Sequence, residues 1–207
     1  MKLAVHNITG KETSKKISLS NDVFGVEPND HAIYLDVKQY LAAQRSGTHK
    51  TKGRSEVKGS RRKIRKQKGS GAARVGDIKN PLFRGGGRVF GPQPRKYHFK
   101  INKKVKRLAR KSALSYKAKD MNIIILKDFS FEKPNTKSYC DFLSNFDLLN
   151  NKTLLVLPES NNNIFLSSRN LKNAKVLLAS ELNTYDVMSA SKLMIMESSM
   201  NQIEKFF

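Results

Sequence analysis

The side chains best suited to chemistry in this sequence are its lysines and arginines, and the chemistry they serve is phosphate binding. Of the 207 residues, 40 are Lys or Arg and 17 are Asp or Glu, which gives a formal net charge of +23. Residues 45–119 hold 26 of the basic residues and only two acidic ones, whereas residues 1–44 are neutral and residues 120–207 sum to −1. Charge confined in this way predicts a polyanionic partner for one segment, nucleic acid in preference to an anionic membrane surface.

Motifs for catalysis or cofactor binding are weak by comparison. Residues 69–74 (GSGAAR) begin like a dinucleotide-binding loop, but Arg74 stands at the third glycine position and no apolar strand precedes the motif. Gly10-Lys11 lacks the upstream glycine and the following Ser or Thr of a P-loop. The four histidines are scattered, and Cys140 has no Cys or His at metal-ligand spacing. We therefore expect no enzyme, no metal and no other cofactor.

The chain carries no pattern for export or membrane insertion. No stretch approaches the roughly 18 consecutive apolar residues of a membrane helix. The first residues lack an apolar signal region, and the single cysteine excludes an internal disulfide. We expect a cytoplasmic protein with no membrane partner.

The basic segment is also rich in glycine and poor in apolar residues. Ten of the twelve glycines lie between Gly47 and Gly91, where they permit positive φ angles and close backbone approach. Burial of these few apolar residues cannot offset the conformational entropy that the segment loses when it becomes ordered. We therefore expect this segment to fold on a polyanion. Two apolar groups, residues 81–83 and 89–92, either pack into an RNA groove or on bases, or anchor the loop on the rest of the protein.

The elements that must position this segment read as an α/β fold. Residues 122–126, 153–157, 175–179 and 192–196 are apolar runs typical of buried parallel strands, and helical segments at 134–149, 164–171 and 183–190 separate them. Near the N-terminus, Asp30 is a candidate cap for a helix over residues 31–44, and residues 200–206 favour a last helical turn. Alternation of this kind predicts a parallel sheet covered on both faces.

Residues 102–119 form a helix candidate with Asn102 as its N-cap. At 100° per residue, one arc contains Val105, Leu108, Ala109, Ser112, Ala113 and Tyr116, with Leu114 outside it. The opposite arc is basic and contains no glutamate, unlike an ordinary solvated face. We expect the first arc to dock on the sheet and the second to meet phosphates.

A segment that leaves its domain near Gly47 and returns near Gly91 has its midpoint at residue 69. Each arm of about 22 residues could extend roughly 70 Å. The small residues at the far end favour a tip that works in a confined space inside a large RNA.

These residues resemble the universal large-subunit ribosomal protein four family of the bacterial type, along essentially the whole chain. The most specific match is residues 66–76 (KQKGSGAARVG). Further matches lie at residues 45–48, 80–87, 92–95, 102–104 and 165–171.

The resemblance implies a three-layer α/β domain with a mainly parallel four- to five-stranded sheet, interrupted by a long, basic, Gly-rich extended loop. Residues 1–44 plus 92–207 would form the single globular domain, and residues 45–91 the loop that penetrates large-subunit rRNA. The loop tip would line the constriction of the nascent-peptide exit tunnel.

Two sets of site residues follow. The tunnel-lining tip would comprise Lys68, Gly69, Ser70, Gly71, Ala72, Ala73 and Arg74. The rRNA-binding residues would be Arg45, Lys52, Arg54, Arg61, Arg62, Lys63, Arg65, Lys66, Arg84, Arg88, Arg95, Lys96, Lys103, Lys104, Lys106, Arg107 and Arg110.

The implied partners are large-subunit rRNA, neighbouring large-subunit proteins and the nascent polypeptide at the tip, with no homo-oligomer. Two alternatives remain open. One is an extra-ribosomal RNA-binding regulator, since some bacterial members of the family repress their own operon through its leader mRNA. The other is a nucleotide-dependent enzyme on the α/β domain.

Overall fold

Apolar runs in the C-terminal half form the central strands of a mixed sheet. The structure, a computed structural model, describes residues 1–206 and divides into two units. The globular unit comprises Met1–Leu41 together with the chain from Lys100 onward, and the inserted unit comprises Ala42–Phe99.

Among the residues described, no helix or strand lies between α2 (Asp30–Ala43) and α3 (Lys103–Lys119). The elements in chain order are β1 (Lys2–His6), β2 (Glu12–Ser18), α1 (Asn21–Phe24), α2 (Asp30–Ala43), α3 (Lys103–Lys119), β3 (Ile123–Leu126), α4 (Thr136–Ser144), β4 (Thr153–Leu157), α5 (Asn162–Ser168), β5 (Ala174–Leu178), the 3-10 turn η1 (Ala179–Glu181), α6 (Thr184–Ser189), β6 (Lys192–Met196) and α7 (Glu197–Phe206).

The sheet has six strands in the order β2-β1-β3-β6-β4-β5. Only β1 and β2 pair antiparallel; the other neighbours are parallel, with Ile125 opposite Ile195 and Leu155 opposite Met194. The α/β class is confirmed, but the expectation of four to five strands is wrong. Two strands were not predicted, β1 and β2; β2 reads ETSKKIS and is exposed along most of its length at the sheet edge. Because neither of its faces is fully buried, it lacks the alternation that would have revealed it.

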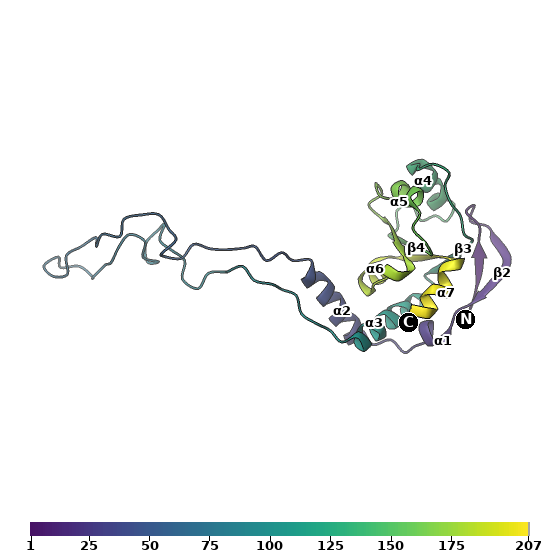
Figure 1. Ribbon diagram of the computed structural model, residues 1–207, viewed down its shortest axis with the longest axis horizontal. Helices are drawn as coiled ribbons and strands as arrows, with labels where there is room; N and C mark the ends of the chain where they lie inside the picture. Colours follow the sequence, from purple (N-terminus) through teal and green to yellow (C-terminus); the bar gives the residue numbers. More distant parts are fainter. Residues whose placement is uncertain (207) are drawn as a thin grey trace. The chain divides into compact units, whose positions relative to one another are not determined.

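Side chains that alternate along the strands fill two cores, one on each face of the sheet. Ile125, Leu154 and Leu193 belong to one core, to which α1, α3, α6 and α7 contribute side chains. Leu126, Leu155 and Met194 belong to the other, which α4 and α5 complete. The result is three layers, with α4 and α5 on one side of the sheet and α3 and α7 on the other (Figure 1).

Asparagine side chains begin three of the covering helices. The side chains of Asn135, Asn161 and Asn183 accept hydrogen bonds from backbone N–H groups in the first turns of α4, α5 and α6. The helix expected over residues 134–149 ends at Ser144, short of Asp147, whose φ of +56° is incompatible with a helix. At α2 the cap is Asn29, whose Oδ1 accepts from Ala32 N at 2.9 Å, and not Asp30 as expected. Asp30 instead accepts a hydrogen bond from the Tyr116 hydroxyl at 2.6 Å.

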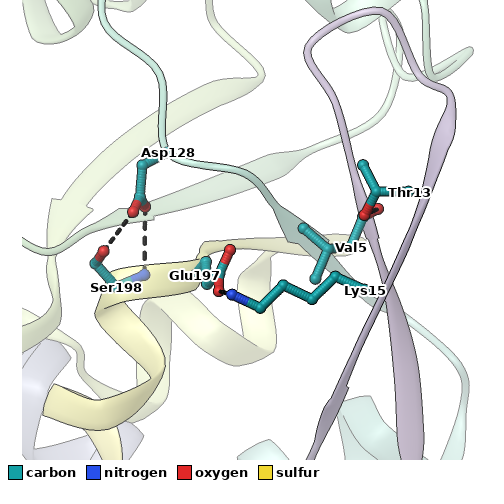
Figure 2. Close-up of polar contacts among 6 residues, drawn as sticks. All are labelled: Val5, Thr13, Lys15, Asp128, Glu197 and Ser198. Carbon is teal, nitrogen blue, oxygen red and sulfur yellow. Dashed lines mark hydrogen bonds and ion pairs between the residues drawn. The ribbon is translucent and has the colours of Figure 1, made fainter.

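Polar contacts hold the C-terminal helix, α7, from β2 and from the residue Asp128 just after β3 (Figure 2). Asp128, just after β3, accepts hydrogen bonds from the backbone N–H of Ser198, at 3.3 Å, and from its hydroxyl. Lys15 of β2 forms an ion pair with Glu197 at the start of α7. These contacts tie α7 to the β1–β2 side of the sheet. Within residues 1–206, none of the helices combines the length and the apolar character that crossing a bilayer requires.

Helix α3 buries Ala109, Ser112 and Ala113 of the expected face, but the buried face is shifted to one side. Leu114, which lies outside the predicted arc, is 0% exposed, whereas Leu108 within that arc is 37% exposed. The buried face includes Ser115, whose hydroxyl donates to Val23 O of α1, because α1 and α6 both contact the helix. The docking face therefore turns toward Leu114 and away from Leu108.

This correction predicts opposite outcomes for two leucines of one helix. Replacing Leu114 with Ala should lower the free energy of unfolding by about 2–5 kcal/mol, because it leaves a cavity in a closed core. The matched control, Leu108→Ala, should change it by less than about 0.5 kcal/mol. Urea denaturation of the full chain, followed by far-UV circular dichroism, measures both. Equal losses for the two variants would contradict the assigned face.

Candidate nucleic-acid interface

The inserted unit consists of two arms that run out and back beside one another (Figure 1). Backbone hydrogen bonds join them at Arg88 N to Lys52 O, 2.9 Å, and at Ile64 N to Gly76 O, 3.0 Å. The midpoint of each of these pairs is residue 70, which lies within the predicted tip. A third bond, Thr51 N to Pro92 O at 3.1 Å, joins the arms nearer their base.

The predicted cations of this unit are all exposed to solvent. The same holds for every residue of the predicted tip, from Lys68 to Arg74. The exposed cations are Arg45, Lys52, Arg54, Arg61, Arg62, Lys63, Arg65, Lys66, Arg84, Arg88, Arg95 and Lys96. Their charges therefore face outward along both arms.

The two carboxylates of the basic segment are each paired within it. Glu56 forms an ion pair with Lys50, and hydrogen bonding to Lys50 is the main reason that its pKa lies below the usual value. Asp77 Oδ1 lies 2.9 Å from Arg54 Nη2 and 3.2 Å from Arg54 Nε. Because both carboxylates are engaged, neither neutralises the remaining cations.

Two kinds of glycine shape the arms. Gly69 and Gly71 have φ angles of +83° and +61° with open space where a side chain would begin, so the turn at the tip requires their conformational freedom. At Gly87 the reason is space, because a Cβ atom there would lie 2.3 Å from the backbone nitrogen of Arg54. Glycine thus serves the bend at the tip and a close crossing of the arms lower down.

A tyrosine joins cations from both arms near the base of the unit. The guanidinium carbon of Arg45 lies 3.8 Å from the ring centre of Tyr97, and that of Arg95 lies 4.6 Å from it. His49 Nε2 is hydrogen bonded to the Tyr97 hydroxyl at 2.7 Å. The pKa of Tyr97 is lowered, first by its hydrogen bond with Arg95 and then by the two positive charges. A guanidinium group that lies over an aromatic ring can still donate N–H hydrogen bonds to phosphates.

The basic face of α3 contributes fewer exposed cations than expected. Lys103, Lys104 and Arg107 are exposed, whereas Lys106 and Arg110 are half-buried. Lys106 Nζ donates to Gln39 Oε1 at 3.1 Å. Lys117, on the same predicted arc, donates to the carbonyl of Ala190 at 2.6 Å, and burial lowers its pKa. The last turn of the helix is therefore used for docking.

Several features of the inserted unit were not predicted from the sequence. Lys79 is only 7% exposed, and Tyr97 holds two arginines; neither was among the predicted site residues. In the two apolar groups, residues 81–83 and 89–92, Leu82 is 87% exposed and Phe90 is 103% exposed. Both side chains are therefore available to a partner. In the described part of the chain, no cluster of three or more His, Cys, Asp or Glu side chains could hold a metal ion.

Comparison with known proteins identifies the family of this chain. Residues 17–206 match the model of the ribosomal protein L4/L1 family. The chain is 58% identical to the large ribosomal subunit protein uL4 of Flavobacterium johnsoniae over 205 residues, which are 99% of this chain and 98% of the relative. It is 59% identical to that of Flavobacterium psychrophilum, with the same coverage, and 58% identical to that of Parabacteroides distasonis over 100% of this chain and 99% of the relative. A family-model match of this extent, with relatives this similar along their whole length, means that the chain belongs to the ribosomal protein L4/L1 family.

Proposed function

We propose that this protein binds large-subunit rRNA, with residues 45–91 as the part that penetrates the RNA. As a member of its family it is a structural, non-enzymatic protein of the large ribosomal subunit, in the cytoplasmic ribosome. The observation that carries the proposal is the unpaired charge of the inserted unit. Its predicted cations are exposed, and the two carboxylates of the segment are already paired with Lys50 and Arg54. Such a surface requires a dense array of anions, which an RNA backbone supplies.

Exposed apolar side chains among the cations favour RNA with unpaired bases. Leu82 and Phe90 stand out from the arms, and Phe90 adopts a φ of +50°, unusual for a residue other than glycine. Aromatic side chains stack on splayed bases in RNA recognition, whereas phosphate contacts alone would need no such group. Strain held at an exposed aromatic residue is consistent with a binding role.

The tip, residues 68–74, is proposed to line the constriction of the nascent-peptide exit tunnel. Its residues are small apart from Lys68 and Arg74, all are exposed, and glycines at positive φ make the turn narrow. The proposed partners are large-subunit rRNA, neighbouring large-subunit proteins and the nascent chain, without homo-oligomers. The second candidate, a regulator that binds leader mRNA away from the ribosome, has no feature of its own in this structure.

The first test concerns the salt dependence of rRNA binding. If about ten cations engage phosphates, the logarithm of the association constant should fall with the logarithm of salt concentration with a slope of roughly −7 to −9. Changing Arg61, Arg62 and Arg65 together to Gln should reduce the magnitude of this slope by about 2–3. The reason is that each phosphate contact that is lost lowers the number of counterions released on binding. Filter binding of the full chain to purified large-subunit rRNA measures the slope.

The matched control removes three exposed lysines of the globular unit, Lys127, Lys133 and Lys152, by the same change to Gln. This variant has the same net charge as the triple arginine variant but should retain the wild-type slope. An equal effect of both triple variants would show that total charge, and not the inserted unit, drives binding. A wild-type protein that does not bind the rRNA would refute the proposed function itself.

The second test removes the tip. Deletion of residues 66–74 leaves the partners Ile64 and Gly76, so the arms can still close below the deletion. The variant should enter large subunits, as judged by sedimentation in high-salt gradients, but should alter macrolide sensitivity or nascent-chain stalling. Ser70→Ala, which retains the backbone of the tip, serves as the control. Wild-type behaviour of the deletion variant in both assays would contradict the tunnel role.

A further inference from the structure

A hollow of about 290 Å³ opens in the globular unit, at the carboxyl ends of β4 and β5. Its lining comes from Leu157 of β4, residues 176–178 of β5, residues 160–162, Phe165 of α5 and Glu181. The chain continues from β4 into α5 on one face of the sheet and from β5 toward α6 on the other, since the two helices complete different cores. Neighbouring strands whose connections diverge in this way leave a crevice between them, which is where open α/β sheets bind ligands.

The charge of this hollow is opposite to that of the protein as a whole. Of the described residues, no Lys or Arg lines it, and Glu181 is its only charged member. The Glu181 side chain is exposed, and within residues 1–206 its carboxylate has no ion pair or hydrogen bond. A free carboxylate repels phosphates and attracts cations. The hollow therefore favours a cationic group over an RNA backbone.

The wall beside this carboxylate is apolar. Phe165 is 49% exposed, and its neighbour in α5, Leu166, is 41% exposed. The long stem of an arginine or lysine can lie along such a ring while its charged head donates to Glu181. Ser160 and Asn162, both exposed, add hydrogen-bonding side chains to the lining. A cationic side chain thus matches both the apolar wall and the carboxylate.

The edge of the sheet next to the hollow indicates what carries this side chain. β5 is the last strand of the sheet, and in the described part of the chain no strand pairs with its outer edge. Thr153 N donates to Asn173 O at 2.8 Å, so by alternation along β5 the backbone N–H and C=O of Val176 point away from β4. Lysines on edge strands oppose pairing with another strand, but Lys175 is neutralised here by Asp186, 2.5 Å away. The outer edge of β5 is therefore suited to accept an added strand.

We propose that a basic, extended segment of a neighbouring large-subunit protein adds to β5 as a further strand and places one Arg or Lys side chain in the hollow. Main-chain hydrogen bonds to Val176 would supply affinity, and the contacts with Phe165 and Glu181 would supply specificity. This inference rests on the proposed contact with neighbouring large-subunit proteins and assigns it a surface and a partner chemistry. A small free cation would occupy the hollow without pairing with β5, and a second copy of this chain would pair β5 with itself.

Photocrosslinking within purified large subunits tests the identity of the occupant. The full chain is expressed with Phe165→p-benzoylphenylalanine, and the matched control carries the same change at Tyr34, an exposed aromatic residue of α2. Irradiation of the Phe165 variant should give an adduct with one segment, rich in Lys or Arg, of a second large-subunit protein, and the Tyr34 variant should not label that segment. Adducts only with rRNA, with a second copy of this chain, or with no macromolecule would overturn the proposal. Absence of the wild-type chain from large subunits would instead refute the proposed function.

A synthetic peptide with the crosslinked sequence then tests how the segment binds to the full chain. For Glu181→Gln we expect the Kd of this peptide to rise about 2- to 5-fold, whereas Glu27→Gln, at an exposed glutamate elsewhere in the globular unit, should change it by less than about 1.5-fold. Saturating peptide should slow hydrogen exchange at the Val176 amide by about 10-fold or more in the wild-type chain. Equal effects of the two glutamate variants would overturn the cation site. Binding without protection of Val176 would overturn the addition of a strand.

Discussion

The structure depends on one electrostatic constraint, the mutual repulsion of 26 basic residues placed in a segment with only two acidic ones. The protein neutralises this segment very little itself, since Glu56 and Asp77 are each paired with one cation. Backbone hydrogen bonds, the contacts of Arg45 and Arg95 with the Tyr97 ring and the ion pair of Arg54 with Asp77 hold the arms together. Repulsion keeps the remaining cations facing outward, and the missing negative charge must come from a partner.

The globular unit escapes this constraint because its stability comes from apolar burial. Alternate residues of the strands fill a core on each face of the sheet, and the covering helices close both. Helix α3 combines apolar burial with exposed positive charge. Leu114 and Ala113 are buried in one core. At the start of the helix, the side chains of Lys103, Lys104 and Arg107 remain exposed. The chain thus keeps its hydrophobic and its electrostatic tasks in separate segments, with α3 serving both.

Sequence reasoning succeeded where the physical signal was local. Apolar runs located β4 and β6 at their observed bounds, and the motif at residues 66–76 resembles the family that the comparisons confirm. It failed where the outcome depends on tertiary neighbours. Polar β2 is a strand because it pairs with β1, and Leu114 is buried because α1 and α6 both contact α3. Lys79 could not be told from other lysines, because its burial depends on a crossing of two arms distant in sequence.

The central claim is that rRNA phosphates supply the charge that the inserted unit lacks. A cryo-electron microscopy map of the large subunit, purified from cells expressing this protein, tests it most directly. The account predicts density for residues 45–91 enclosed by rRNA, with the guanidiniums of Arg61, Arg62 and Arg65 within ion-pair distance of phosphate oxygens. A map in which these residues project into solvent, or in which another protein surface faces these arginines, would contradict it.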